Sequence, residues 1–168
     1  MFFNKNKLSI LFTSSSARKE DKLFESIYGH HNIKKLFRMA FESPNTCSIL
    51  LSGPSASSKT LFLQSLMRKL QDSYFIDCSN ATKSDMVDYI FDNKPKYLLL
   101  DKLDKLSRKH QTFLLNLMET GIVSETKCNK TRGMGIKTSV CATSNNIEKI
   151  ILPLQSRFFI VKLDPYTY

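Results

Sequence analysis

The chain has 168 residues, 42% of them hydrophobic and 24% charged, a composition that fits one globular domain and excludes a disordered or fibrous chain. The 25 Lys and Arg residues against 15 Asp and Glu residues give a net charge of +10, which favours nucleic acid, nucleotides or anionic surfaces as partners without choosing among them. No apolar run approaches the roughly 18 residues of a membrane span, so we expect no membrane partner. The cysteines are isolated along the chain, which predicts reduced thiols in a cytoplasmic protein and no structural metal.

The first segments are an arm without a regular pattern and an amphipathic helix. Residues 1–21 mix lysines with a serine cluster and show neither a helical nor a strand period, which predicts an irregular basic arm before a folded core at 22–168. Apolar side chains between Ile33 and Phe41 recur with a helical period until Pro44 interrupts it. This helix should bury one face.

Short apolar runs alternate with longer amphipathic segments through the rest of the core. Five runs have the length and composition of strands, at 47–52, 74–78, 97–100, 140–143 and 158–163. Helices are expected after Lys59, over 83–91, from a Ser107 cap to Gly121, and briefly around 147–152. Because strands that alternate with helices form parallel sheets, the predicted fold is α/β, a three-layer αβα sandwich with a five-stranded parallel sheet.

The segment between the first strand and the next helix has the spacing of a phosphate-binding loop, G-x-x-x-x-G-K-[ST]. In such loops backbone N–H groups surround the phosphates, the lysine reaches the β- and γ-phosphates, and the next hydroxyl holds Mg²⁺. Lys59 and Thr60 take these positions, while Ser58 replaces the second glycine. A serine-rich turn is the alternative. The candidate nucleotide-binding residues here are Gly53, Pro54, Ser55, Ala56, Ser57, Ser58, Lys59, Thr60 and Leu61.

A carboxylate, Asp101, ends the apolar run of the third predicted strand. An Asp at this place binds Mg²⁺ beside a phosphate-binding loop; a simple cap of the strand end is the alternative. A carboxylate that orients the attacking water is expected next, but the residue is Lys102, and a protonated lysine cannot accept that proton. Asp104, two residues further on, should point elsewhere and is a poor replacement.

Residues 121–138 are rich in basic side chains. Lys127, Lys130, Arg132 and Lys137 accompany the single acid Glu125, and glycines allow a turn. The pattern predicts a basic hairpin. Contact with a nucleic-acid phosphate backbone is the functional interpretation, and a solvated surface loop is the alternative.

Two polar residues near the end of the chain are further candidates. Asn145 follows the strand at 140–143 and would sit beside the γ-phosphate if that strand lies between those that carry the loop and Asp101; otherwise it caps the next helix. Arg157 precedes the last strand, where an arginine can reach a neighbouring subunit's nucleotide or remain a surface residue.

Six segments, in this order and spacing, resemble the AAA+ ATPases: Ile27-Tyr28-Gly29-His30, GPSASSKT, YLLLDKLDKL, METG, CATSNN and LQSRF. The closest likeness is to archaeal AAA+ proteins that are similar to RuvB, the motor of Holliday-junction branch migration, and it covers about residues 22–168. In that group a small residue before the loop lysine is usual, which accommodates Ser58.

The resemblance implies ATP and Mg²⁺ as cofactors, with Thr60 and Asp101 as the residues that hold Mg²⁺. It implies that Asn145 senses the γ-phosphate and that Arg157 acts in trans on the neighbouring subunit. It assigns the adenine pocket to Ile27, Tyr28 and Gly29.

The sequence departs from this family pattern in two places. Lys102 stands at the position of the catalytic glutamate, which puts hydrolysis in doubt but not binding. The sequence ends at Asp164-Pro165-Tyr166 and two further residues, where the family's helical lid should begin, so we expect that lid to be absent.

These observations lead to two main hypotheses. The first is a subunit of a homo-oligomeric ring, a hexamer, that hydrolyses ATP and moves DNA as a helicase or branch-migration motor. The second, motivated by Lys102, is a regulatory module that binds ATP without hydrolysing it. An AAA+ remodeller of proteins shares every nucleotide motif found here.

Overall fold

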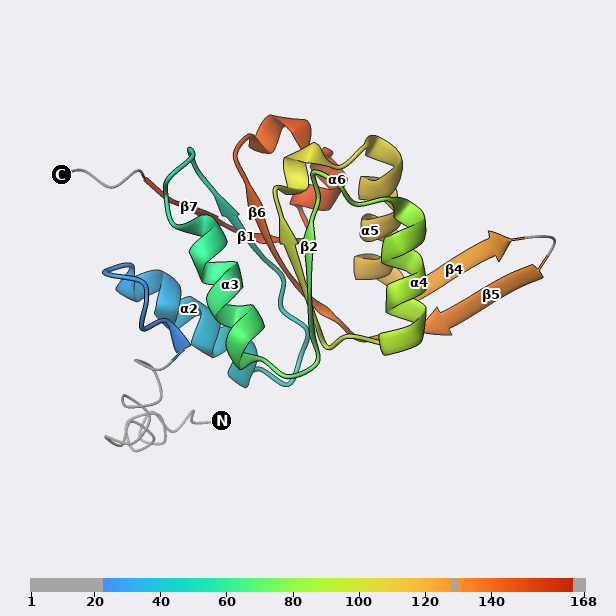
Figure 1. The fold of residues 1–168 in the computed structure, drawn as a ribbon, viewed down its shortest axis with the longest axis horizontal. Coiled ribbons are helices and arrows are strands. Elements are labelled where there is room, and N and C mark those ends of the chain that lie inside the picture. The colour runs from blue at the N-terminus through green and yellow to red at the C-terminus, as the bar shows by residue number, and fades with distance from the viewer. Residues whose placement is uncertain (1–22, 128–129, 165–168) are drawn as a thin grey trace, which may run out of the picture.

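The computed structural model describes residues 23–127 and 130–164, and the predicted arm at 1–21 lies outside this part. Figure 1 shows a central sheet with helices on both of its faces. None of the helices in the described ranges is long and apolar enough to cross a bilayer. The main elements are α2 (His31–Glu42), β1 (Ile49–Ser52), α3 (Lys59–Lys69), β2 (Ser73–Asp77), α4 (Lys83–Asn93), β3 (Tyr97–Asp101), η2 (Leu103–Lys105), α5 (Arg108–Thr120), β4 (Ile122–Lys127), β5 (Lys130–Gly135), β6 (Ser139–Ser144), η3 (Ile147–Lys149), α6 (Leu152–Gln155) and β7 (Phe159–Lys162).

The central sheet has five strands in the order β2-β3-β6-β1-β7, and every neighbouring pair is parallel. This confirms the predicted five-stranded parallel sheet. β6 lies between β1 and β3, which is the condition under which Asn145 was expected near the phosphate site. The carboxyl ends of these three strands therefore share one edge of the sheet.

Alternating side chains of the strands supply two apolar layers. Ile49 and Leu51 pack with the side of the sheet covered by α2 and α3, whereas Leu50 packs with the side covered by α4 and α5. Leu99 and Leu100 divide in the same way. Because successive strand residues point to opposite faces, a strand buried on both sides is apolar throughout. The predicted three-layer αβα sandwich is confirmed.

Helix α5 has the ends that the sequence predicted. The Ser107 hydroxyl accepts the backbone N–H of His110, and Gly121 follows the helix with φ 66°. A serine N-cap and a left-handed glycine after the last turn satisfy backbone groups that a helix leaves unpaired at its ends.

The helix expected around 147–152 forms two separate pieces, η3 and α6, so this prediction was wrong in its continuity. Pro153 has no N–H to donate to the carbonyl of Lys149, so a continuous helix would lose that bond. The Gln111 amide donates to that carbonyl instead, at 3.0 Å. The chain is therefore extended at Ile150 and Ile151 between the two pieces.

The first strand is shorter than its apolar run. It begins at Ile49 rather than at Cys47, and the N–H of Cys47 donates to the Ser139 hydroxyl at 3.2 Å. A side chain of the neighbouring strand β6, rather than its backbone, thus satisfies this backbone N–H.

The predicted hairpin at 121–138 is confirmed as an antiparallel pair, β4 and β5, with register from Ile122↔Gly135 to Lys127↔Lys130. It forms a separate two-stranded sheet. In Figure 1 it projects away from the three layers, beyond α4 and α5.

Candidate nucleotide-binding site

Residues 53–58 carry the chain from β1 to α3 over a tight path. A β-carbon on Gly53 would collide with the backbone carbonyl oxygen of Leu163, whose N–H bonds to the Ser52 carbonyl at 2.7 Å. The first position of the loop therefore requires glycine. This steric demand comes from the residue that follows β7, the strand that pairs with β1.

Two loop residues adopt a left-handed backbone although neither is glycine. Ala56 has φ 63° and Ser58 has φ 62°, a conformation that costs a residue with a β-carbon about 1–2 kcal/mol. Ser58 thus takes the backbone conformation that a glycine in its place would favour. The substitution adds local strain without preventing the turn into α3.

Lys59 begins α3 and turns its buried side chain back onto the loop. Its Nζ donates to the carbonyl oxygens of Gly53 at 2.8 Å and Pro54 at 2.5 Å, and to the Ser57 hydroxyl at 3.0 Å. Burial lowers the pKa of Lys59, an effect that the carboxylates of Asp101 and Asp104 oppose. The three acceptors are two carbonyl oxygens and a hydroxyl, which carry no net charge. They therefore do not neutralise the ammonium group of Lys59, whose charge is available to an anion.

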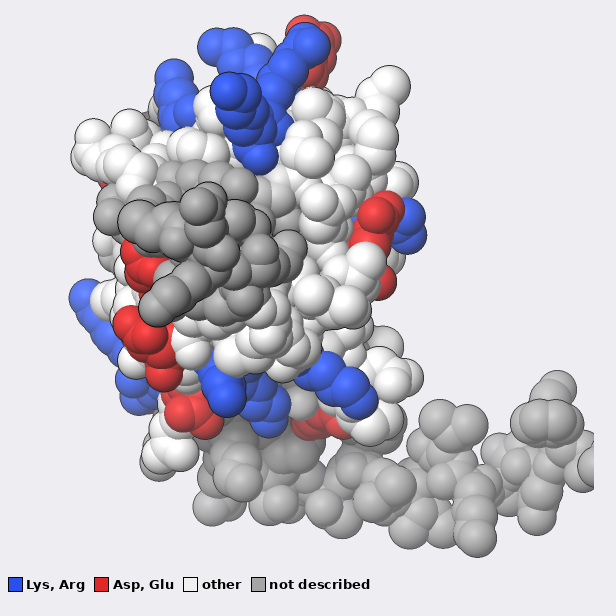
Figure 2. Space-filling view, turned by 90° about the vertical axis from the view of Figure 1, so that its right-hand side faces the viewer, with Lys and Arg blue, Asp and Glu red and all other residues white. Residues whose placement is uncertain are grey.

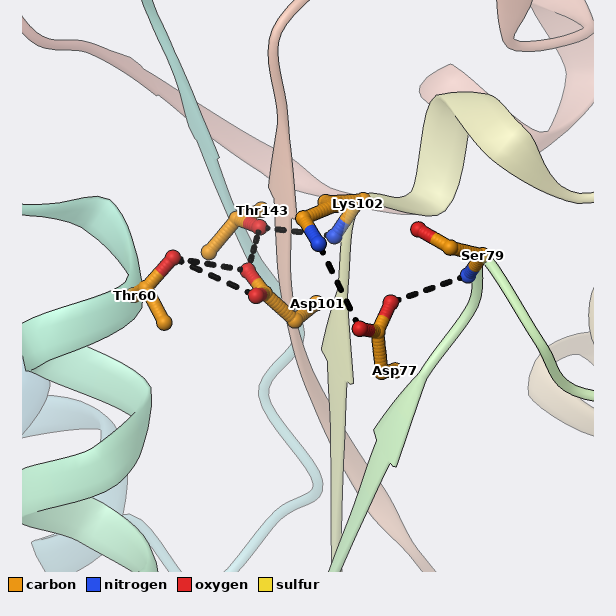
Figure 3. A network of polar contacts seen from close by, with 6 residues as sticks. All are labelled: Thr60, Asp77, Ser79, Asp101, Lys102 and Thr143. Carbon is orange, nitrogen blue, oxygen red and sulfur yellow. Dashed lines mark hydrogen bonds and ion pairs between the residues drawn. The ribbon is translucent and has the colours of Figure 1, made fainter. Parts of the chain in front are cut away.

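Figure 3 shows the hydroxyls of Thr60 and Thr143 both directed at the Asp101 carboxylate. The Thr60 hydroxyl lies 3.1 and 3.2 Å from the two carboxylate oxygens, and the Thr143 hydroxyl donates to Oδ1 at 2.5 Å. Asp101 is 4% exposed. A hydroxyl beside a buried carboxylate is the set of oxygen ligands that Mg²⁺ prefers, so these residues fit a Mg²⁺-nucleotide.

Lys102 turns sharply out of β3, with φ 58° and ψ 52°. Its backbone N–H donates to the Thr143 hydroxyl at 2.9 Å, and its Nζ pairs with Oδ2 of Asp77 at 3.3 Å. The N–H of Ser79 donates to the other oxygen of Asp77 at 2.9 Å. The pKa of Asp77 is lowered first by its hydrogen bonds with Ser79 and then by Lys102. An ammonium group, not a carboxylate, thus follows Asp101.

Asp104 contributes to the segment that carries Asn145. Its buried Oδ1 accepts the backbone N–H of Asn145 at 3.0 Å. Asp104 does not line the cavity beside the loop. It therefore anchors the residue that follows β6.

A cavity of about 500 Å³ brings most of the predicted residues together. It lies between the start of α3 and the carboxyl ends of β3 and β6. Its lining residues are Ser55, Ala56, Ser57, Ser58, Lys59, Thr60, Leu61, Asp101, Lys102, Thr143 and Asn145.

Other predicted residues lie away from this cavity. Ile27 is buried and Tyr28 is 91% exposed, and with Gly29 they belong to a segment beside α3, where Ser26 Oγ lies 3.4 Å from Ser65 Oγ. None of the three lines the cavity. Their assignment to adenine therefore stays a prediction.

The basic residues and the predicted finger also lie outside it. Arg157 is exposed and binds Glu119 through Nε at 3.1 Å and Nη2 at 2.5 Å. Lys137 is exposed and lines a different cleft, at the base of the hairpin. The side chains of Lys127, Lys130 and Arg132 are outside the described part of the structure.

The sequence reasoning missed two residues that organise the site. Thr143 links the Asp101 carboxylate to the backbone of Lys102, and Asp77 pairs with the side chain of Lys102. Both were counted within apolar strands. The feature that could have identified both is a polar residue at the carboxyl end of a strand that is a parallel neighbour of β3.

Comparison with known proteins gives one match and one negative result. The sequence model of the family described as "ATPase family associated with various cellular activities (AAA)" matches residues 49–165. No curated protein matches the chain. The match begins with β1 and includes the loop, Asp101 and Asn145.

Proposed function

Because the chain belongs to the AAA family and is thereby an ATP-binding AAA+ ATPase, we propose that it is a subunit of a ring-shaped assembly that acts on DNA. The projecting basic hairpin is the observation that carries this proposal. The nucleotide site supplies the energy source, and the hairpin supplies the contact with DNA.

The cavity beside the loop would hold ATP and Mg²⁺. Lys59 would bind the phosphates, and Thr60 and Asp101 would hold the metal ion. Bound Mg²⁺ neutralises phosphate charge during phosphoryl transfer. The buried position of Asp101 and its two hydroxyl neighbours support this assignment.

The hairpin supports DNA as the partner. Its sequence holds three cations, Lys127, Lys130 and Arg132, against the single acid Glu125, and it stands clear of the core (Figure 1). Figure 2, which faces the end from which it projects, shows Lys and Arg side chains gathered at the upper rim and mixed with Asp and Glu side chains at the lower rim. Cations on a protruding element suit a phosphate backbone. Following the likeness to archaeal RuvB-like proteins, we propose branched DNA as the substrate.

Assembly into a ring, which we propose to be a hexamer, would give Arg157 its function. Domains of this family commonly form rings. Arg157 is exposed, lies away from the chain's own cavity and is held by Glu119. An arginine so placed can complete the nucleotide site of a neighbouring subunit.

A second candidate is a module that binds ATP without hydrolysing it and regulates a partner. Lys102 favours it, because a protonated lysine at the position after Asp101 cannot accept the proton of the attacking water. In the structure this lysine pairs with Asp77 at 3.3 Å. The rate of phosphate release decides between this candidate and the motor.

The proposed DNA function is tested by binding and ATP turnover with branched and single-stranded DNA at low salt. Replacing Lys127, Lys130 and Arg132 by Ala should weaken DNA binding and remove any stimulation of turnover. A charge-matched control replaces Lys35, Arg68 and Lys69, exposed residues of α2 and α3, and should retain both. A native chain without DNA binding or DNA-stimulated turnover would refute the motor, and stimulation by protein alone would favour a remodeller.

A further inference from the structure

We propose that Lys102 contacts the terminal phosphate of bound ATP and makes the site prefer ATP to ADP, with Asp77 as the competitor that holds Lys102 when that phosphate is missing. This inference rests on the proposed nucleotide site. It gives the lysine that replaces the expected carboxylate a function in binding.

The position of Lys102 places its side chain at the right cavity. Lys102 lines the same cavity as Lys59, Thr60 and Asn145. Its backbone is held by the hydrogen bond to Thr143 at 2.9 Å, and the left-handed turn at this residue directs the chain away from β3. The side chain therefore starts from a fixed point beside Asp101.

The contact that holds Lys102 is easily exchanged. Its Nζ lies 3.3 Å from Asp77, and the two side chains are 41% and 40% exposed. An ion pair at this exposure contributes little to stability, whereas a phosphate offers several charged oxygens and shorter charge-assisted hydrogen bonds. A phosphate in the cavity should therefore displace Asp77 as the partner of the Lys102 ammonium group.

The other acids nearby do not compete in the same way. Asp101 accepts hydrogen bonds from Thr60 and Thr143, and Asp104 accepts one from the backbone of Asn145. Asp77 is itself anchored by the N–H of Ser79, so it stays in place when Lys102 leaves. The structure thus offers the ammonium group two positions, one on Asp77 and one toward the cavity.

The preference for ATP follows from the side on which Lys102 lies. Lys59 is bound to the loop, while Lys102 lies across Asp101 from Thr60, on the side of β2 (Figure 3). The two phosphates of ADP would lie in the loop and contact Lys59. The third phosphate of ATP would extend away from the loop and contact the second cation, the ammonium group of Lys102.

The test is calorimetric binding of ATP and of ADP, each with Mg²⁺, to the full native chain and three variants. Lys102→Gln should weaken ATP binding by about tenfold or more and leave ADP binding nearly unchanged, because one charge-assisted contact is lost. Asp77→Asn should tighten ATP binding, because it removes the competitor. Lys105→Gln, an exposed lysine of η2 outside the cavity, should change neither.

Each outcome has a defined meaning. A selective loss of ATP affinity in Lys102→Gln with a gain in Asp77→Asn supports the inference. Equal changes for ATP and ADP, no change, or weaker ATP binding in Asp77→Asn would overturn it while ATP binding itself stands. If the native chain binds neither nucleotide, the proposed function fails as well.

Discussion

The two sides of the nucleotide cavity are built differently. On the loop side, Lys59 is buried and donates to three oxygens, and Gly53 is fixed by the carbonyl of Leu163. On the side of β2, Lys102 is partly exposed and its ammonium group has one ion pair, with Asp77. The ammonium group of Lys59, which keeps the family pattern, is held by several contacts, whereas within the described residues the ammonium group of Lys102, which departs from it, is held by one exchangeable ion pair. Binding should therefore depend on the first side, and turnover and nucleotide preference on the second.

The largest expected effect restores a carboxylate on the weakly held side. Lys102→Glu combined with Asp77→Asn, which removes like-charge repulsion, should raise phosphate release about 100-fold or more, in the range of general-base catalysis. Single-turnover release with saturating ATP measures it. The control, Lys102→Gln with Asp77→Asn, removes the same charges without adding a base and should stay at the native rate. An equal rise in the control would mean that the cation, not the missing carboxylate, limits hydrolysis.

Gly53→Ala tests the strongly held side. The added methyl group meets the Leu163 carbonyl and should lower the free energy of unfolding by about 1–3 kcal/mol, as overpacking does. Urea denaturation measures the change. Gly135→Ala, where no atom lies within 4 Å of the added carbon, is the matched control and should not lose comparable stability. Equal losses would contradict the account of the loop.

Thr143→Val tests the bridge between the two sides. The change keeps the shape but removes the hydroxyl that links Asp101 to the N–H of Lys102, and it should cost about 1–3 kcal/mol of unfolding free energy because buried partners are left unpaired. Thr112→Val, at an exposed position of α5, should cost distinctly less under the same denaturation. A neutral Thr143→Val would show that the bridge does not stabilise the site.

Ala56→Gly should relieve strain in the loop. Ala56 has φ 63°, a left-handed conformation that is strained for alanine and that glycine adopts freely. Glycine also makes the unfolded chain more flexible, which offsets part of the benefit. The free energy of unfolding of the variant should therefore rise by about 0.5–1 kcal/mol. Thermal and urea unfolding measure the gain. Ser55→Gly has no such strain to relieve and should be neutral or slightly destabilising; a gain of equal size there would refute the explanation.

The smallest effect is in the titration of Asp77. Its pKa in the folded chain lies below the ordinary value of about 3.9, so its contribution to stability is present above that value and is lost as the pH falls through the folded pKa. Carboxyl NMR in the native chain and in Lys102→Gln measures it. The variant should raise the pKa only partly, because the Ser79 hydrogen bonds are the larger cause. No rise at all would show that Lys102 does not reach Asp77 in solution.

The sequence predicted the fold well because apolar periodicity reports burial directly. The five strands, the cap at Ser107 and the stop at Gly121 each depend on local patterns. The break between η3 and α6 has a local cause in Pro153, which the sequence prediction did not use, and it is completed by Gln111 of α5, whose side-chain amide donates to the Lys149 carbonyl. Such a long-range contact has no local signature.

The site was predicted only in part, because some of its residues have a local sequence pattern and others do not. The loop and Asp101 are recognisable by their spacing in the sequence, and the cavity brings them together with Asn145. Asp77 and Thr143 are recognisable only when the strand order is known, because β2 and β6 become neighbours of β3 through crossovers. The left-handed turn at Lys102 likewise cannot be read from a lysine in a sequence.

The most direct test of the central claim, that ATP binds on the loop at 53–60, is equilibrium binding of ATP with Mg²⁺ to the native chain and to Lys59→Ala. Lys69→Ala, an exposed lysine on the last turn of the same helix, serves as the control. The account predicts that the native chain and Lys69→Ala bind alike and that Lys59→Ala loses at least about tenfold in affinity, because a charged hydrogen-bond donor to phosphate is removed. Native affinity in Lys59→Ala would contradict it.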